Sequence, residues 1–500
     1  MSPLFSDTER KDKSMILCDK FYIDGAWVDP IDPSPFPIMN PATNSQIGTV
    51  SLGTRADVDR AVAAAARAFE SFSKTSKQER LALLRRLRDI LEARNEEMAQ
   101  AISQEMGAPL TMAREEQAAC GIAYAEDFAN ILEALEDQEE LPNGDVVLRE
   151  PIGVCGLITP WNWPINQIAQ KVMPALAVGA TCVLKPSEYT PLSAALFAEI
   201  IHEAGYPAGV FNLVFGNGPS VGSALSTHPD ITMMSFTGST RAGVQVSKDS
   251  ADTIKRVALE LGGKSPNLLF ADCDLDARVT ASVQECFHNT GQSCNAPTRL
   301  LVERSCYGKA LEIARHAAET QSLGDPAQEG AHIGPLFDQM QFDRVQAMIQ
   351  IGIDEGATLL AGGLGKPEGF EQGWYARPTI FADVNNDMRI AREEIFGPVL
   401  VMIPFDSEEE AIAIANDSDF GLYAYVQTGS KSRATRVASS LRAGAVAING
   451  HATAYGSPFG GYKQSGNGRE GGKFGLEEYL EVKVMPSLDQ LADEGCFSKP

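Results

Sequence analysis

Short apolar segments alternate with amphipathic ones through the middle of this chain, and this alternation constrains its fold more than any other feature. From Gly153 onward, each strand-like run is followed by apolar residues at helical spacing. Such alternation implies a parallel sheet covered by helices on both faces, which binds ligands at the carboxyl ends of its strands. The predicted strands are Val154 to Ile158, Thr181 to Leu184, Phe211 to Val214, Ile231 to Phe236 and Arg256 to Glu260.

The same alternation returns between about residue 261 and residue 445 and predicts a second α/β domain with its own core. Residues 1 to about 50 are predicted to be irregular, with prolines punctuating short extended pieces, and helices are expected from there to about residue 135. A hairpin arm near 136–150 and a final strand at 477–485 complete the prediction. In the second domain the predicted strands are Pro266 to Phe270, Thr298 to Val302, Val399 to Phe405 and Tyr423 to Gln427.

The composition argues against several classes of protein. The net charge of −24 argues against nucleic acid or an anionic membrane as a partner. The longest apolar stretch, 174–184, is far shorter than the roughly 20 residues that span a bilayer, and the polar N-terminus shows no secretory signal. The nine scattered cysteines predict free thiols in a reducing compartment, and hence a cytoplasmic protein. Cys286, His288 and Cys294 lack the spacing of zinc ligands, so we expect no metal.

One cysteine stands on a turn that suits a nucleophile. Cys294 follows the pair Gly291-Gln292, shortly after an amphipathic run that ends at Phe287. Glycine allows a sharp bend, and a thiol presented on such a bend is open to a substrate while helix dipoles favour its thiolate. A buried core cysteine is the commoner interpretation of such a segment taken alone. The hypothesis therefore depends on the groups that surround Cys294.

Two turns that follow predicted strands carry candidate polar groups. Asn162 can donate an amide N–H to a developing oxyanion, although an Asx turn is the better explanation of its tetrapeptide taken alone. Lys185 and Glu188 suit the paired hydroxyls of a ribose, and the carboxylate would repel a 2′-phosphate, which favours NAD over NADP. A solvated turn with a surface ion pair explains Lys185 and Glu188 equally well.

Two glycine-containing turns differ in how well they suit a phosphate. The segment 216–222 departs from the G-x-G-x-x-G pattern because its last glycine stands one place late. The segment 236–240 fits better, since it delivers a glycine and hydroxyls to a predicted helix N-terminus.

Two further segments of the chain contain candidate carboxylates, Glu260 and Glu394. Glu260 closes an apolar strand, where desolvation would raise its pKa and suit a general base; an ion pair with Lys264 or Lys255 is the alternative. Glu394 and Phe396 suit a ribose and a nicotinamide ring, and a solvated acidic turn held by one buried aromatic ring is the alternative.

Taken in order, these segments resemble the NAD(P)-dependent aldehyde dehydrogenase superfamily. The likeness extends from about residue 20 to about residue 490, and the late glycine of 216–222 also fits, because that family holds the pyrophosphate differently from other dehydrogenases. The matching motifs are Pro160-Trp161-Asn162, Lys185-Pro186-Ser187-Glu188, Phe236-Thr237-Gly238-Ser239, Leu259 to Lys264, Gly291-Gln292-Ser293-Cys294, Glu393 to Pro398, Asn449, Pro458-Phe459-Gly460-Gly461 and Lys463 to Glu470.

The resemblance implies a role for each matching residue. Cys294 would attack the aldehyde to give a thiohemiacetal, Asn162 and the backbone N–H of Cys294 would bind the oxyanion, and Glu260 would activate the water that hydrolyses the thioester. The implied cofactor is NAD, with NADP less favoured. The residues implied to contact it are Trp161, Lys185, Ser187, Glu188, Gly218, Phe236, Gly238, Ser239, Gln341, Glu394 and Phe396.

The resemblance also implies the architecture. We expect an aldehyde dehydrogenase-like α/β fold with a Rossmann-type parallel-sheet cofactor domain at 1–135 and 151–260 and a second α/β catalytic domain at 261–445. A small β oligomerisation arm at 136–150 and 470–500 would build a homodimer or homotetramer.

The implied activity is that of an NAD-dependent enzyme of class EC 1.2.1 that oxidises an aliphatic, aromatic or semialdehyde substrate to its acid. The alternatives are a CoA-acylating aldehyde dehydrogenase, a non-enzymatic binding or structural protein on the same fold, and a cofactor-free thiol hydrolase or acyltransferase. The presence of Cys294 and Glu260 favours hydrolysis of a thioester. By resemblance, the candidates for the substrate pocket, none of them an arginine, are Asn166, Lys171, Phe287, Ser293, Asn295, His451, Tyr455 and Phe459.

Overall fold

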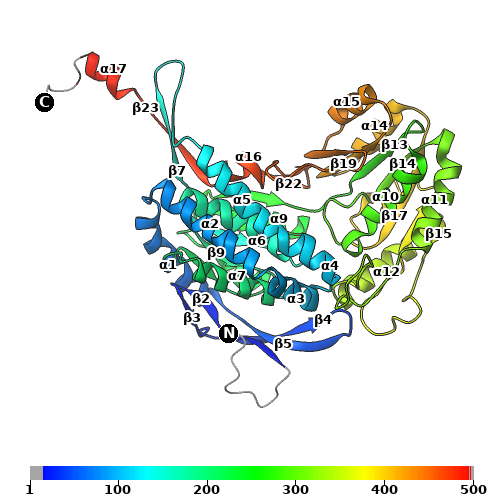
Figure 1. Cartoon of the computed structure of the whole chain (residues 1–500), viewed down its shortest axis with the longest axis horizontal. Coiled ribbons are helices and arrows are strands. Elements are labelled where there is room, and N and C mark those ends of the chain that lie inside the picture. The colour runs from blue at the N-terminus through cyan, green and yellow to red at the C-terminus, as the bar shows by residue number, and fades with distance from the viewer. Residues whose placement is uncertain (1–14, 495, 497–500) are drawn as a thin grey trace.

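The computed structural model describes residues 15–494 and residue 496. They form two α/β lobes, and a three-stranded sheet projects from the first lobe (Figure 1). The first lobe contains an eight-stranded sheet and the second a seven-stranded sheet, and both are mixed sheets made largely of parallel strands. The predicted α/β fold class is therefore confirmed.

The central strands of the first sheet coincide closely with the predicted ones. The five strands from β12 to β10 are parallel to their neighbours, and β22, β2 and β3 add antiparallel edges. In sheet order the strands are β22 (Gly466–Asn467), β12 (Arg256–Glu260), β11 (Met233–Thr237), β8 (Val154–Ile158), β9 (Thr181–Lys185), β10 (Phe211–Leu213), β2 (Phe21–Ile23) and β3 (Ala26–Val28).

In the described part of residues 1 to about 50, the predicted short extended pieces are present, but they are strands paired in regular sheets rather than irregular segments. Residues 1–14 lie outside the described residues. Besides β2 and β3, the described part contains β1 (Ile16–Cys18), β4 (Ser34–Asn40) and β5 (Ser45–Leu52), which form a sheet in the order β1-β5-β4. Pro35 and Pro37 stand in β4, which is an edge strand and therefore tolerates residues without an N–H to donate.

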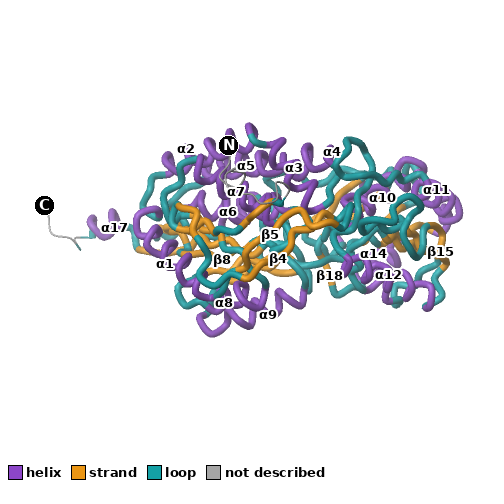
Figure 2. Tube along the Cα trace, turned by 90° about the horizontal axis from the view of Figure 1, so that it is seen from below, coloured by secondary structure: helices purple, strands orange, loops and turns teal. Residues whose placement is uncertain are grey.

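Helices cover both faces of the first sheet (Figure 2). In α6 every residue except Asn166 is buried, and Pro164 at its first position and left-handed Gly179 just past its end fit the usual helix boundaries. The helices are α1 (Arg55–Phe72), α2 (Lys77–Ala93), α3 (Asn95–Met106), α4 (Leu110–Met112), the π-helical turn η2 (Ala113–Ala118), α5 (Ala119–Ala134), α6 (Pro164–Val178), α7 (Pro191–Glu203), the π turn η3 (Gly218–Gly222), α8 (Ser223–Thr227), α9 (Thr240–Ser250) and the short 3₁₀ turn η4 (Ala251–Thr253).

In the second lobe the structure adds three strands, β15, β16 and β20, to the four predicted. β15 and β20 stand at the sheet edges, and β15 is antiparallel to its neighbour. In sheet order the strands are β15 (Thr358–Ala361), β16 (Thr379–Ala382), β17 (Val399–Phe405), β14 (Arg299–Glu303), β13 (Pro266–Leu269), β19 (Tyr423–Gln427) and β20 (Ala445–Ile448).

The sheet of the second lobe separates two apolar clusters, one on each of its faces, and helices contribute to both clusters. The helices are α10 (Leu275–Phe287), the 3₁₀ turns η5 (His288–Gly291) and η6 (Arg304–Cys306), α11 (Tyr307–Glu319), α12 (Gln339–Asp354), α13 (Arg389–Arg392), α14 (Glu408–Asn416) and α15 (Lys431–Ser440).

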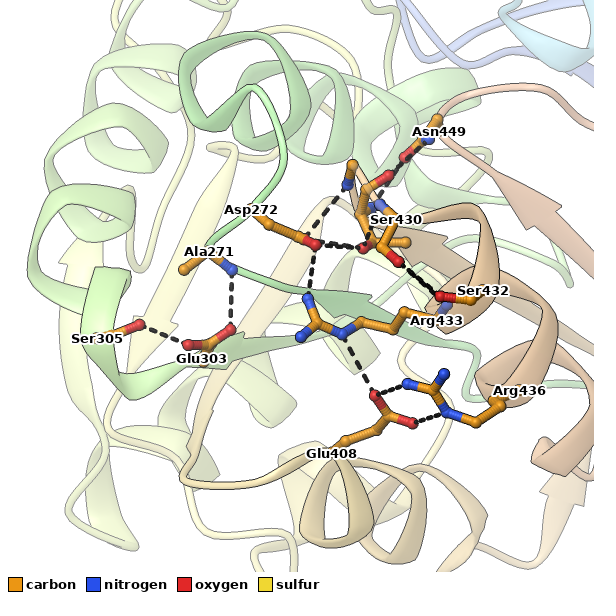
Figure 3. A network of polar contacts seen from close by, with 12 residues as sticks. Ala271, Asp272, Glu303, Ser305, Glu408, Ser430, Ser432, Arg433, Arg436 and Asn449 are labelled. Atoms are coloured by element: carbon orange, nitrogen blue, oxygen red, sulfur yellow. Dashed lines mark hydrogen bonds and ion pairs between the residues drawn. The ribbon is translucent and has the colours of Figure 1, made fainter.

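A polar network joins the ends of β13 and β19 to helices α14 and α15 (Figure 3). Asp272 accepts hydrogen bonds from Thr428 and pairs with Arg433 at 2.7 Å, and Arg433 and Arg436 both contact Glu408. Asn449, part of the family-like pattern, exchanges hydrogen bonds with the backbone of Thr428 at 2.9 and 3.0 Å. In this structure the side chain of Asn449 therefore closes a loop of the second lobe.

The projecting sheet is antiparallel and has the order β23-β7-β6. Val482 and Val484 on β23 are more than half exposed, so the sheet presents apolar side chains to its surroundings. Its strands are β6 (Gln138–Glu140), β7 (Val146–Pro151) and β23 (Leu480–Met485). The helices α16 (Gly472–Glu477) and α17 (Leu488–Asp493) precede and follow β23 in the chain, and the short strands β18 (Phe420–Gly421) and β21 (Tyr462–Lys463) pair with each other. Within the described residues, every helix is too short or too polar to cross a bilayer.

Candidate functional site

Cys294 lies on a strained loop that follows α10. Asn289 and Thr290 both have positive φ angles, of 50° and 57°, which side chains other than glycine rarely adopt. The next residue, Gly291, has φ of 71°, and a Cβ there would meet the carbonyl oxygen of Gly397 at 2.1 Å. Only glycine fits so close to that carbonyl, so the predicted sharp bend before Cys294 has a direct structural reason.

Buried amides hold this loop in place. Gln292, which is fully buried, accepts a hydrogen bond from the backbone N–H of Phe337 at 2.8 Å and donates one to the carbonyl of Asn289 at 3.1 Å. Thr290 donates from its hydroxyl to the carbonyl of Gly334 at 3.0 Å. Because strained backbone persists only where its surroundings fix it, these bonds position Cys294.

Asn162 belongs to the same arrangement. Its side-chain amide donates to the carbonyl of Gln292 at 3.0 Å, and its own carbonyl accepts from the side chain of Asn289 at 3.0 Å. The side chain of Asn162 is thus bonded to the residue two positions before Cys294, and it helps to hold the loop. One of the two amide N–H groups is used in this bond, which leaves the other to donate.

Cys294 lies where two cavities meet. It lines a cavity of about 330 Å³, which we call the proximal cavity, together with Asn162 and Glu260. It also lines a second cavity of about 380 Å³, the helix-lined cavity, on the side of α5 and α6. Cys294 therefore stands on the wall of both cavities.

The electrostatic surroundings of Cys294 differ from the prediction. Burial raises the pKa of its thiol, and the carboxylates of Glu394, Glu260 and Glu470 raise it further. The expectation that helix dipoles favour the thiolate is therefore wrong for this structure, because desolvation and nearby negative charge dominate. The thiol needs a base to accept its proton.

Glu260 is a candidate for that base. It ends β12, is buried, and neither carboxylate oxygen has a hydrogen-bond partner among the described residues. Burial and the neighbouring Glu470 raise its pKa well above the usual range, as the sequence predicted. No ion pair joins Glu260 to Lys264 or Lys255 in the described part of the chain, so the alternative explanation of Glu260 is not observed.

A third cavity, of about 640 Å³, adjoins the proximal one, and we call it the distal cavity. Pro160, Thr237 and Gly238 line both, so the two form a continuous space along the carboxyl ends of the first sheet. In the distal cavity the Lys185 ammonium lies 3.2 Å from the Glu188 carboxylate. Also lining it are Ser187, Gly218, Phe236 and Gly238.

The proximal cavity contains the remaining predicted cofactor residues. Trp161 packs edge-on against Phe396 with ring centroids 5.6 Å apart, and Gln341 donates to the carbonyl of Phe396 at 2.6 Å. The Glu394 carboxylate accepts from the backbone N–H of Gly263 at 3.0 Å, and burial raises its pKa. Ser239 lines this cavity too, and its hydroxyl caps the N-terminus of α9. All eleven residues proposed to bind a cofactor thus lie along one continuous space.

The helix-lined cavity contains five of the eight residues predicted to form the substrate pocket. Asn166, Ser293, Asn295, Tyr455 and Phe459 line it as predicted.

Three predicted pocket residues lie elsewhere. Lys171 is fully buried inside α6, where it forms an ion pair with Glu470 and donates to Ser235. Phe287 is buried in the core of the second lobe, and His451 is exposed on a loop. Lys171 and Phe287 fail because their side chains point into cores, which spacing alone did not reveal.

Several residues of this cavity were missed by the sequence analysis. They come from the π-helical turn η2, from α5, from the residue that precedes α6, and from the end of α10 and the turn after it. They include Glu115, Glu116, Tyr124, Trp163, Glu285 and His288. The acidic pair Glu115-Glu116 within an otherwise alanine-rich helical stretch was the available signal. A π turn widens the helix locally and often marks a functional site, but the sequence does not predict one.

Comparison with known proteins gives a consistent result. Residues 27–485 match the model of the aldehyde dehydrogenase family. A 3-succinoylsemialdehyde-pyridine dehydrogenase from a Pseudomonas species is 54% identical over 93% of this chain and 98% of its own length. An aldehyde dehydrogenase from Bartonella henselae superposes with a TM-score of 0.93 at 50% identity, covering 94% of this chain and 99% of the other. A variant of aldehyde dehydrogenase C from Pseudomonas syringae, solved with NAD+ and octanal, has the same TM-score and identity over 94% and 97% of the two chains.

Proposed function

This chain belongs to the aldehyde dehydrogenase family, and from that premise we propose that it oxidises an aldehyde to the carboxylic acid with NAD+ through a covalent intermediate on Cys294. The observation that carries the proposal is the position of Cys294 on the wall of two cavities, one fit for an elongated cofactor and the other for a substrate. Aldehyde oxidation follows from the family; the cofactor and the mechanism are our proposals.

The residues present fit a dinucleotide. A dinucleotide has two ribose-bearing halves, and each of the two adjoining cavities contains a carboxylate, Glu188 in the distal cavity and Glu394 in the proximal one. Such acids accept hydrogen bonds from ribose hydroxyls. At Gly218 a Cβ would meet nothing within 4 Å, which leaves open space in the cradle. When bound there, the nicotinamide supplies the acceptor for the hydride that leaves the substrate carbon.

The first step joins Cys294 to the substrate. Glu260 takes the thiol proton, through water if needed, and the sulfur bonds to the carbonyl carbon while the carbonyl oxygen becomes an oxyanion. The second amide N–H of Asn162 and the backbone N–H of Cys294 donate to that oxygen. Loss of hydride from the same carbon then leaves a thioester on Cys294.

The second step releases the product. Glu260, which lines the proximal cavity and has both oxygens unpaired, first releases the thiol proton to solvent and then accepts a proton from water as that water attacks the thioester carbon. The carbon–sulfur bond breaks, the acid leaves, and the proton held by Glu260 passes to the sulfur and restores the thiol of Cys294. Because a CoA-acylating enzyme needs no such base, the presence of Glu260 favours hydrolysis over acyl transfer.

The helix-lined cavity favours an uncharged aldehyde with an aromatic or extended apolar part. Trp163, Tyr124, Tyr455 and Phe459 supply aromatic surface. Glu115, Glu116 and Glu285 stand along the same cavity, and neither lysine nor arginine is found among the described residues that line it, so an anionic aldehyde is disfavoured. The Pseudomonas relative, whose name describes a pyridine-bearing semialdehyde, points to the same class of substrate.

We also propose a homodimer or homotetramer built through the projecting sheet. The exposed valines of β23 on an edge strand are the surface that such contacts would cover.

The activity is tested by NADH absorbance with benzaldehyde and with octanal, each with and without CoA. We expect NADH formation that does not depend on CoA and yields the free acid. NADH formation only in the presence of CoA would establish the acylating alternative, and no turnover of any aldehyde would refute the proposal.

A further inference from the structure

A fourth cavity, of about 410 Å³, lies beside the helix-lined one and has no part in the proposed reaction; we call it the side cavity. It is enclosed by α4 and η2 of the first lobe, by α10 and α11 of the second, and by the loop that contains Gly330, Ala331 and His332. Figure 1 shows α4 and α10 on the two sides of the boundary between the lobes.

Of the described residues, two line both the side cavity and the helix-lined cavity: Glu116 and His288. The imidazole of His288 lies 3.1–3.2 Å from the Glu116 carboxylate, and its ring stacks against that of Trp163 with centroids 6.1 Å apart. The pair therefore forms a partition between the two spaces, made of side chains alone.

This partition is easily displaced. Both side chains are more than one third exposed, and a solvent-exposed ion pair contributes little stability. Glu116 stands on the wide π turn η2. Rotation of either side chain would join the side cavity to the cavity that contains Cys294.

We propose that the side cavity is an extension of the substrate site that receives the distal part of long aldehydes when the Glu116–His288 partition opens. The inference rests on the proposed function, since it assumes that the aldehyde group is bound at Cys294. Most side chains around the side cavity carry hydrogen-bonding groups, among them Thr111, Gln284, Gln321 and Ser322. The ligand that fits is therefore a linear aldehyde with a hydrogen-bonding group at its far end.

The test compares three aldehydes: propanal, decanal and 10-hydroxydecanal. The readout is the ratio of kcat/KM for each long aldehyde to that for propanal, because a ratio is insensitive to changes in the amount of active enzyme. His288→Ala removes half of the partition and should raise the ratio about tenfold, the size of effect that one or two extra buried methylenes give in specificity. The increase should be larger for 10-hydroxydecanal than for decanal.

A second substitution locates the effect. Ala331 is exposed on the far wall of the side cavity, so a large side chain is accommodated there, and Ala331→Trp should fill the space. In the double variant His288→Ala/Ala331→Trp the ratio should return to the wild-type value. Glu116→Ala repeats the test from the other half of the partition, and His316→Ala, at an exposed histidine that lines neither cavity, is the matched control.

The possible outcomes distinguish a failure of the proposed function from a failure of the side cavity as part of the substrate site. Failure of the wild type to oxidise any aldehyde would refute the proposed function itself. Oxidation of propanal with no change of the ratio in either partition variant, or a change that Ala331→Trp does not reverse, would refute the side cavity as part of the substrate site. A return to the wild-type ratio in the double variant supports it.

Discussion

The two sides of Cys294 are built in different ways. On the side of the distal and proximal cavities, several polar residues, such as Lys185, Glu188 and Glu260, stand at the ends of parallel strands or on the turns that follow them, and helices α8, α9 and α12 add to the lining. On the other side, η2, α5 and α6 supply a helical wall, and loop residues 293–296 and Tyr455 face the same cavity. A site made of strand ends is fixed by the topology of a sheet, whereas a site made of helix faces depends on how each helix is rotated. The first kind is suited to a constant partner and the second to a variable one.

The largest expected effect falls on the residue that both sides share. Replacing Cys294 by alanine should lower kcat on the order of 10⁴-fold or more, because the covalent step is lost. The affinity for NAD+, measured by calorimetry, should change less than about threefold. Cys273→Ala, at a half-buried thiol that lines none of the four cavities, is the control and should retain activity. If turnover survived in Cys294→Ala, the nucleophile would be misassigned.

Glu260 should control the second half-reaction. Glu260→Gln keeps the shape of the side chain but removes the base, so kcat should fall by roughly 10²- to 10⁴-fold. If hydrolysis is the step affected, a burst of NADH close to one equivalent should precede the slow phase in stopped-flow absorbance. An absent burst together with a slow first turnover would mean that Glu260 acts mainly in the attack of Cys294.

Glu260 should also make the catalytic activity depend on pH. Glu260 works as a carboxylate, and its raised pKa means that this form becomes populated at higher pH than for an ordinary carboxyl group. The pKa of the Cys294 thiol is also raised, so both groups favour activity on the alkaline side. We expect kcat/KM to keep rising as the pH increases beyond the range in which an ordinary carboxyl group titrates. A profile that is flat above that range would contradict both assignments.

The contrast between the two sides of Cys294 also explains which parts of the fold and of the site could be predicted from the sequence. The strands β8, β12, β17 and β19 have the predicted bounds, because continuous apolar runs between turn residues identify buried strands. Lys185, Glu188 and Gly238 stand at the ends of such strands or just after them, so their place at one edge of the sheet could be predicted. Gln341, Glu394 and Phe396 do not follow the predicted strands, and only the family resemblance placed them with the other cofactor candidates. Lys171 shows the opposite case. Its position on α6 could be predicted, but its burial and its pairing with Glu470, 299 residues away, could not.

Asn162, which lines the proximal cavity together with Cys294, provides a test of the oxyanion site. Asn162→Ala should lower kcat by roughly 10²- to 10³-fold, as expected for the loss of one oxyanion donor. Asn162 also bonds to Gln292 and so helps to hold the loop that contains Cys294. A control must therefore separate its role as an oxyanion donor from its role in positioning this loop. Thr290→Ala removes a different support of the same loop, the hydrogen bond to Gly334, and should cost less than about tenfold. Equal losses in the two variants would make Asn162 a positioning residue only.

The smallest effect is expected at the far end of the distal cavity, at Glu188. Its carboxylate lies 3.2 Å from Lys185 and is partly exposed, so solvent weakens its repulsion of a 2′-phosphate. Glu188→Gln should therefore shift the ratio of kcat/KM for NAD+ over NADP+ by only about tenfold, and mainly through the KM for the cofactor. Selectivity among aldehydes should not move, since Glu188 lines only the cofactor side. Asp249, another acid on the wall of the distal cavity, supplies the matched control as Asp249→Asn. A larger shift with Asp249→Asn than with Glu188→Gln would transfer the discrimination to that residue, and a change in aldehyde preference with either would mean that the two sides of Cys294 are coupled.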